Sequence, residues 1–119
     1  AVFIAFGDGI APVKSLIEHA VSIDAIESFH LYWSVSGPEA QYQSRWCRAM
    51  KESLDNFSYT PLVDSTAEDV VAVVSSDHDG EWGNRRIYVA GPGVQTGPVV
   101  RGLEARGVPS ERIVAESLE

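Results

Sequence analysis

Apolar, strand-like runs alternate with helix-like segments along the whole chain, and this alternation constrains the fold more than any other feature. Residues 1–6, 28–35 and 87–92 are short apolar runs rich in β-branched and aromatic residues, as in strands buried on both faces. Residues 57–65 and 112–118 bring the number of expected strands to five. Strands that alternate with helices predict an α/β fold with a mostly parallel sheet and right-handed crossovers.

The expected helices carry start and stop signals. Gly37-Pro38 ends the second strand and begins a helix. Residues 65–68 read Ser-Thr-Ala-Glu, a capping-box pattern, and favour a helix over 66–77, although the β-branched residues that follow would also suit a strand. The last helix is expected to begin at Thr96 as its cap and to end at Gly107.

Composition limits the kinds of partner that the chain can have. A chain of 119 residues predicts a single domain, and its net charge of −8 argues against nucleic acid and against an anionic membrane surface. With Cys47 as its one cysteine, it can form no internal disulfide. The three histidines lack metal-ligand spacing, and Asp77-His78-Asp79 is interpreted as a solvated loop. No apolar stretch reaches the roughly 20 residues of a membrane span, and we expect a cytoplasmic protein.

Two glycine-bearing corners follow the first and fourth strands. Gly7-Asp8-Gly9 and the segment 90–93 both stand at carboxyl ends of strands, where sheets of this kind bind ligands. Gly7, Gly9 and the turn 10–13, with Pro12 as the first residue of a helix, could form a phosphate cradle. A tight turn without a ligand explains the same residues. Asp8 either caps the helix or accepts hydrogen bonds from ribose hydroxyls or a carboxamide.

Several motifs resemble, in order and spacing, the NAD(P)-binding domain of the ferredoxin–NADP reductase superfamily, and bacterial flavin-dependent NADH oxidoreductases most of all. The stretches that carry the resemblance are "FGDGIAPVKSLIEHA", "LYWSV", "NFSYTPLVDS", "YVAGPG" and "LEARGVPSERIVAESLE". The resemblance implies a Rossmann-like five-stranded parallel sheet of order 3-2-1-4-5 with helices on both faces. It also implies that residues 1–119 are the NAD(P)-binding domain of a reductase and lack an N-terminal barrel that holds FAD or FMN.

The same resemblance assigns the site residues. Ala90 takes the place of the family's cysteine beside the reactive nicotinamide carbon, and Glu116 that of its C-terminal acid; these are the expected catalytic positions. The expected nucleotide contacts lie at the two glycine corners and after the second strand: Gly7, Asp8, Gly9, Ile10, Ala11, Pro12, Ser34, Ser36, Gly91, Pro92, Gly93, Val94 and Gln95.

Departures from the family's pattern leave two functions open. Asp8 replaces a threonine, Ala90 a cysteine, and serines at 34 and 36 stand where the family has a glycine and a nucleotide-gripping arginine. The first function is a module that binds NADH and passes its hydride to a flavin on a partner domain, for onward electron transfer. NADH is favoured over NADPH because no basic cluster follows the second strand. The second is a degenerate, non-catalytic or regulatory relative that keeps the fold and binds nucleotide poorly.

Overall fold

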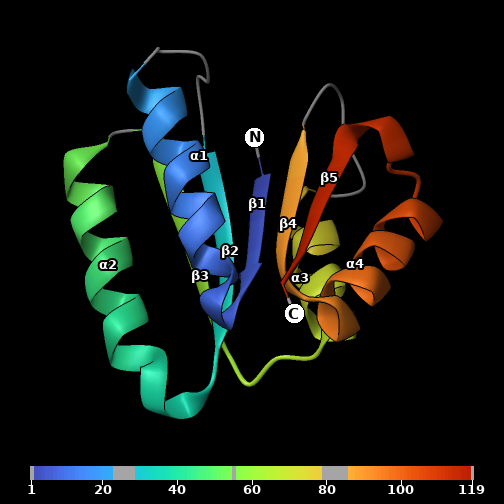
Figure 1. The fold of residues 1–119 in the computed structure, drawn as a ribbon, viewed down its shortest axis with the longest axis horizontal. Helices are drawn as coiled ribbons and strands as arrows, with labels where there is room; N and C mark the ends of the chain where they lie inside the picture. The colour runs from blue at the N-terminus through green and yellow to red at the C-terminus, as the bar shows by residue number, and fades with distance from the viewer. Residues whose placement is uncertain (1, 23–28, 55, 79–85, 119) are drawn as a thin grey trace.

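Five parallel strands form the central sheet of the protein. The structure is a computed structural model that describes residues 2–22, 29–54, 56–78 and 86–118. The strands run in the order β3-β2-β1-β4-β5, and every neighbouring pair is parallel, so the predicted topology is confirmed (Figure 1). Their bounds are β1 Val2–Phe6, β2 Phe29–Val35, β3 Phe57–Val63, β4 Ile87–Pro92 and β5 Ile113–Leu118.

Helices cover both faces of this sheet, as predicted. Helices α1 (Ile10–Ser22) and α2 (Ala40–Ser53) pack on one face, and α3 (Ala67–His78) and α4 (Gly93–Ala105) on the other. Strand β1 lies in the middle of the sheet, and its residues alternate between two apolar cores: Val2, Ile4 and Phe6 face α3 and α4, whereas Phe3 and Ala5 face α1 and α2. This burial on both sides explains the uninterrupted apolar sequence of β1.

Strand β3 tolerates a proline because it is an edge strand. Asp64 N–H, just after β3, donates to the carbonyl of Val35 in β2 at 2.8 Å. Since successive amides of a strand point to opposite sides, the nitrogen of Pro61 faces away from β2 and removes no bond between the two strands.

The start of α3 differs by one residue from the predicted capping box. The Asp69 amide donates to Oγ1 of Thr66 at 3.1 Å, and the Thr66 amide donates to Oδ2 of Asp69 at 3.2 Å. The box therefore pairs Thr66 with Asp69 rather than Ser65 with Glu68. Both pairs have the same spacing, so the sequence pattern alone could not choose between them.

Helix α4 begins earlier than predicted and ends as predicted. It starts at Gly93, directly after the Gly91-Pro92 corner, and Thr96 is a helical residue with 3% exposure rather than a cap. At the other end Gly107 has φ +97°, and its amide donates to Glu104 while the Val108 amide donates to Leu103. These bonds form a Schellman motif, in which glycine supplies the left-handed residue.

No helix in the described parts of the chain has the length and apolarity to cross a membrane.

Cys47 is expected to resist thiol reagents while the chain is folded. It is a residue of α2 whose side chain is buried in the core, and burial raises the pKa of its thiol to about 12, although nearby Lys14 acts in the opposite direction. The reactive form is the thiolate, so a disulfide reagent at about pH 8 should label the folded chain negligibly and the urea-unfolded chain completely. Equal labelling rates in the two states would contradict this burial.

His30 is expected to make folding stability depend on pH. Burial lowers the pKa of His30 from 6.5, and the Asp77 carboxylate offsets part of this change. The folded state therefore holds the proton less tightly than the unfolded chain does. The free energy of unfolding should fall as the pH drops below about 6.5, until the folded pKa is passed. Urea titrations measure the free energy of unfolding, and its change between about pH 7.5 and about pH 5.5 should be larger for the wild type than for His30→Gln. Equal changes in the two proteins would count against this role of His30.

Candidate functional site

The two glycine corners are in direct contact at one edge of the sheet. The first corner is the 3-10 turn Gly7–Gly9, between β1 and α1, and the second is Ala90–Gly93, at the junction of β4 and α4. A Cβ atom added at Gly9 would clash with the carbonyl oxygen of Ala90 and lie 2.5 Å from its carbonyl carbon and 2.9 Å from the Gly91 nitrogen. Only glycine permits this approach, because all three atoms are backbone.

The second corner packs back on the first strand in the same way. Gly91 has φ +151°, and a Cβ atom there would lie 2.8 Å from Cβ of Phe6. By contrast, the described residues leave open space where a side chain at Gly7 would project, and Gly7 has φ +55°. The edge of the sheet therefore combines two corners locked together with an open position above Gly7.

The residues predicted to bind nucleotide lie along this edge at different depths. Ile10 and Gly91 are buried, Pro12, Gly93 and Gln95 are half-buried, and Ala11 and Pro92 are exposed. Val94 is 84% exposed, which is unusual for an apolar side chain. Pro12 is the third helical residue of α1 rather than the first, a position that still tolerates proline because the first helical amides lack partners within the helix. The side chain of Asp8, with its two predicted roles, lies outside the described part of the structure.

The two predicted catalytic positions are neighbours across the sheet. Ala90 of β4 pairs directly with Glu116 of β5, so their side chains lie on the same face. Ala90 is buried and Glu116 is exposed. The pairing brings a carboxylate next to the second corner, where it could accept a hydrogen bond from a ligand.

The serines after β2 have different surroundings. Ser34 is buried, and its hydroxyl oxygen accepts a hydrogen bond from the Ser65 amide at 3.4 Å, so it supports the segment after β3. Ser36 is exposed and directly precedes the 3-10 turn Gly37–Glu39. Asp64 lies beside this turn, since its Oδ2 atom is 3.7 Å from where a Cβ of Gly37 would be. This site adds a carboxylate that the sequence did not single out.

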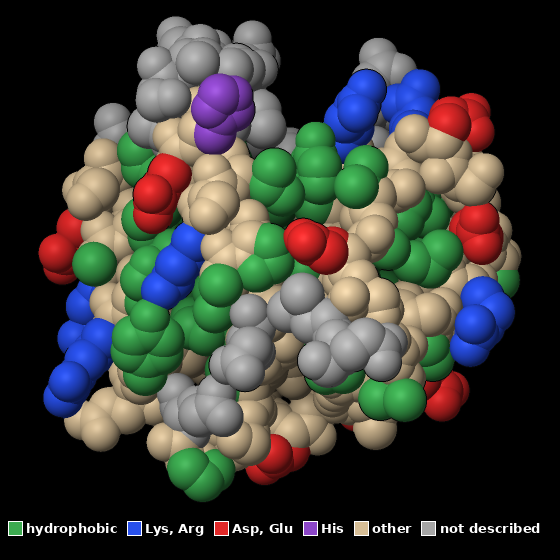
Figure 2. All heavy atoms as spheres, in the orientation of Figure 1, with side chains coloured by type: hydrophobic (Ala, Val, Ile, Leu, Met, Phe, Trp, Pro, Cys, Tyr) green, Lys and Arg blue, Asp and Glu red, His purple; other side chains and the backbone are tan. Residues whose placement is uncertain are grey.

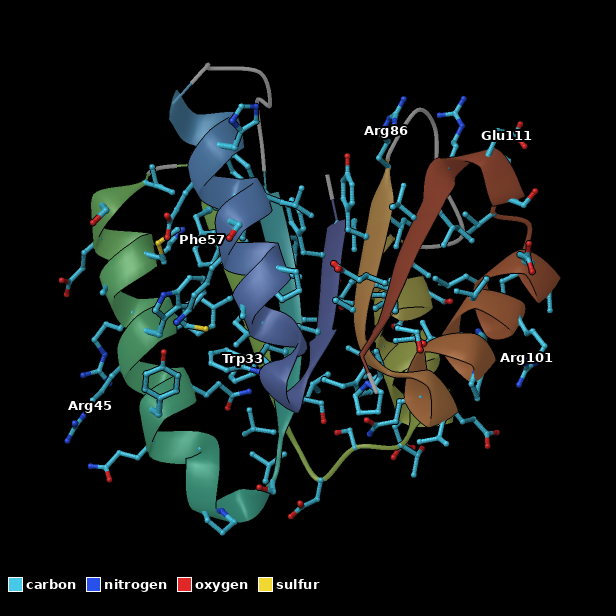
Figure 3. All side chains as sticks on the ribbon, viewed as in Figure 1. Trp33, Arg45, Phe57, Arg86, Arg101 and Glu111 are labelled. Atoms are coloured by element: carbon cyan, nitrogen blue, oxygen red, sulfur yellow. The ribbon has the colours of Figure 1, made fainter. Side chains whose placement is uncertain are left out.

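Three described cations lie or point away from this edge. Arg45 points away from the sheet, and Arg86 precedes β4 at the opposite, amino end of the strands (Figure 3). Lys14, one turn into α1, is turned toward α2, where its Nζ atom lies 5.0 Å from the ring centroids of Tyr42 and Trp46. On the face drawn in Figure 2, Lys and Arg side chains lie at the left, at the upper right and at the right margin.

Gln43 and Trp33 connect the edge to the rest of the fold. The Gln43 side-chain amide donates to the carbonyl oxygens of Trp33 in β2 and Leu62 in β3, the second at 3.1 Å. The Trp33 indole N–H donates to the carbonyl oxygen of Gly7 at 3.2 Å. The sequence gives one sign of the Gln43 contacts, a glutamine among the apolar positions of α2. For the bond from Trp33 to Gly7 it gives only an aromatic residue late in a strand.

Comparison with known proteins gives one curated relative and several solved structures. No protein-family model matches the sequence. Protein RfbI of Salmonella typhimurium is 34% identical over 88 residues, which cover 74% of this chain and 23% of RfbI.

The similar solved structures match nearly the whole of this chain. Amycolatopsis cytochrome P450 reductase GcoB superposes with a TM-score of 0.77 over 98% of this chain at 20% identity. The ferredoxin reductase in carbazole 1,9a-dioxygenase gives 0.74 over 98% at 20% identity, and the CS-b5R domains of human Ncb5or in the NAD+ form give 0.76 over 96% at 14% identity. The chain has the fold of the ferredoxin reductase-like NAD-binding domains.

These likenesses concern part of each relative. At identities of 14–20% they establish the ferredoxin reductase-like fold, which agrees with the resemblance carried by the sequence motifs. The chain spans 36%, 37% and 35% of the GcoB, carbazole-dioxygenase reductase and Ncb5or chains, and about a quarter of RfbI. The ferredoxin reductase-like domain thus corresponds to about a third of each solved chain.

Proposed function

We propose that the chain is the NADH-binding part of a flavin-dependent oxidoreductase. The nucleotide would lie across the carboxyl edge of the sheet, with its phosphates at the first glycine corner and its nicotinamide near Ala90 and Glu116. A flavin, FAD or FMN, carried by a separate domain would accept the hydride. The observation that carries the proposal is the contact between the two corners, which joins two segments that are distant in the sequence at the carboxyl edge of the sheet.

The residues at this edge suit a pyridine nucleotide. Open space above Gly7 allows a phosphate to approach the backbone, and α1 begins directly behind the corner, where helix amides and the helix dipole favour an anion. The nicotinamide supplies the hydride, and the chain's own contribution is to bind and orient it. Ala90 offers a small side chain and Glu116 an acceptor for the carboxamide. Two of the similar solved proteins are named as reductases, and the third, Ncb5or, was determined in an NAD+ form, which supports this assignment.

Asp64 supports NADH over NADPH. Its carboxylate lies beside the turn that follows β2, near Ser36 and Gly37, at the same carboxyl edge. In nucleotide-binding α/β folds a carboxylate can accept hydrogen bonds from ribose hydroxyls and repel a 2′-phosphate. The backbone at Asp64 has φ +52°, a conformation that aspartate and asparagine adopt more readily than most residues.

Asp64→Asn is expected to raise the affinity for NADPH relative to NADH by about 3- to 10-fold, because it removes one negative charge near the 2′-phosphate. Asparagine keeps the left-handed backbone accessible, so the fold should be unchanged. Glu104→Gln, an exposed change of equal charge late in α4, is the matched control and should leave the ratio unaltered. Calorimetric titration with both nucleotides measures the ratio of the two affinities. An unchanged ratio in Asp64→Asn would show that Asp64 is not part of the site.

The proposal as a whole is tested by titrating the 119-residue chain with NADH and NADPH. We expect saturable one-to-one binding, tighter for NADH. Binding that requires the 2′-phosphate would overturn the choice of NADH. No binding of either nucleotide at millimolar concentration would overturn the proposal and favour the non-catalytic relative that keeps the fold.

A further inference from the structure

Trp33 joins the first glycine corner to the core. It lies in β2 and is 2% exposed, and its indole N–H donates to the carbonyl oxygen of Gly7 at 3.2 Å. Gly7 has φ +55° and belongs to a 3-10 turn of three residues between β1 and α1. Such a short turn has few hydrogen bonds of its own, so a bond from the core has a large share in fixing its shape.

The Trp33 ring contacts two aromatic residues of α2. Tyr42 and Trp46 meet it edge-on, with centroid distances of 5.8 Å and 5.9 Å and interplanar angles of 90° and 89°. Edge-to-face contacts at these distances are favourable. The indole therefore has little freedom to rotate away from Gly7.

Lys14 connects α1 to the same aromatic residues of α2. It lies on α1, one turn after the corner, and its Nζ atom is 5.0 Å from the centroids of both Tyr42 and Trp46. Contacts thus run from the Gly7 corner through Trp33 to α2, and from α2 through Lys14 to the helix that begins at the corner. Both sides of the corner are therefore tied to the same aromatic residues, and Trp33 bonds the backbone of the corner directly.

We infer that Trp33 is a positioning residue, which fixes the left-handed Gly7 corner in the shape that receives the phosphates of the nucleotide. The identity of the ligand in this inference rests on the proposed function. The effect of Trp33 on the shape of the corner is independent of that function. Trp33 touches no reacting atom, and acts only through the Gly7 carbonyl.

The test compares Trp33→Phe with Trp46→Phe. Both changes replace an indole in the same aromatic cluster by a smaller ring, and both should lower the melting temperature. The fall should be larger for Trp33→Phe, because Trp33 is buried and Trp46 is half-buried. Only Trp33→Phe removes the bond to Gly7. Without nucleotide, amide hydrogen exchange at Gly9 and Ile10 should become about 10-fold faster in Trp33→Phe, the equivalent of one lost hydrogen bond, and should change little in Trp46→Phe.

The second measurement is the dissociation constant for NADH. It should rise by about 5- to 10-fold in Trp33→Phe and by less than about 2-fold in Trp46→Phe. Equal changes of exchange or of affinity in both variants would overturn the inference, since a merely structural residue gives that result. A wild-type chain that binds no nucleotide would refute the proposed function, and hydrogen exchange alone would then decide whether Trp33 fixes the corner.

Discussion

Replacing Gly9 by alanine is expected to lower the free energy of unfolding by about 3 kcal/mol or more, among the largest effects of a single methyl group. The new Cβ would meet the carbonyl of Ala90 and the nitrogen of Gly91 at distances that real Cβ atoms do not show. Neither neighbour can rotate away, because both are backbone atoms of the second corner. The corners would have to separate, which disturbs the ends of β1 and β4 together. Thermal unfolding should show a fall of roughly 10–15 °C.

Gly37→Ala is the matched control for this prediction. The nearest atom to a Cβ at Gly37 is Oδ2 of Asp64 at 3.7 Å, an ordinary contact. Its effect should stay within about 1 kcal/mol in either direction. Similar losses from both changes, or a Gly9→Ala chain as stable as the wild type, would show that the corners are not packed as described. Lost NADH binding in a folded Gly9→Ala chain would fit the proposed site.

Replacing Gln43 by glutamate is expected to cost about 3 kcal/mol or more at neutral pH. The Gln43 amide is 1% exposed and donates to carbonyl oxygens in β2 and β3. A carboxylate of the same shape would face those oxygens with no proton to donate. The pKa of this carboxyl group in the folded chain should rise above the usual value of about 4.3. The loss of stability should therefore grow as the pH rises above about 4.3, and become smaller as the pH falls toward that value.

Gln41→Glu separates this effect from the change in charge. Gln41 is exposed on the first turn of the same helix, where a negative charge is mildly favourable. Urea titrations of both variants and the wild type at about pH 7 and about pH 5 should show a large, pH-dependent loss for Gln43→Glu only. A small loss without pH dependence would mean that the amide does not bridge the two strands.

The sheet could be predicted because its strands are defined by burial. β1 is apolar at every position, and it lies between two cores that need apolar residues on both faces. Helix starts were less predictable. Thr96 has the chemistry of a cap, yet α4 begins at Gly93 because the chain leaves the Gly91-Pro92 corner already directed into the helix. Local capping signals do not include that tertiary constraint.

The candidate site could be predicted in part. Both glycine corners stood out, since strand ends in a parallel sheet share an edge, and the structure brings them into contact. Asp64 and Gln43 did not. The Asp64 carboxylate lies beside the Gly37 turn, which precedes it by 27 residues, and the Gln43 amide bonds two carbonyl groups from different strands. Contacts of this kind depend on which loops and helices meet, which only the folded chain reveals.

The central claim is that the two glycine corners form one nucleotide-binding edge, and nuclear magnetic resonance tests it most directly. In a titration of the isotope-labelled chain with NADH, the amide signals of Gly7, Gly9, Gly91 and Gly93 should shift together with a single dissociation constant. The signal of Arg86, which precedes β4 at the opposite end of the sheet, should stay in place. Shifts at Arg86 without shifts at the corners, or corners that respond with different constants, would contradict the account.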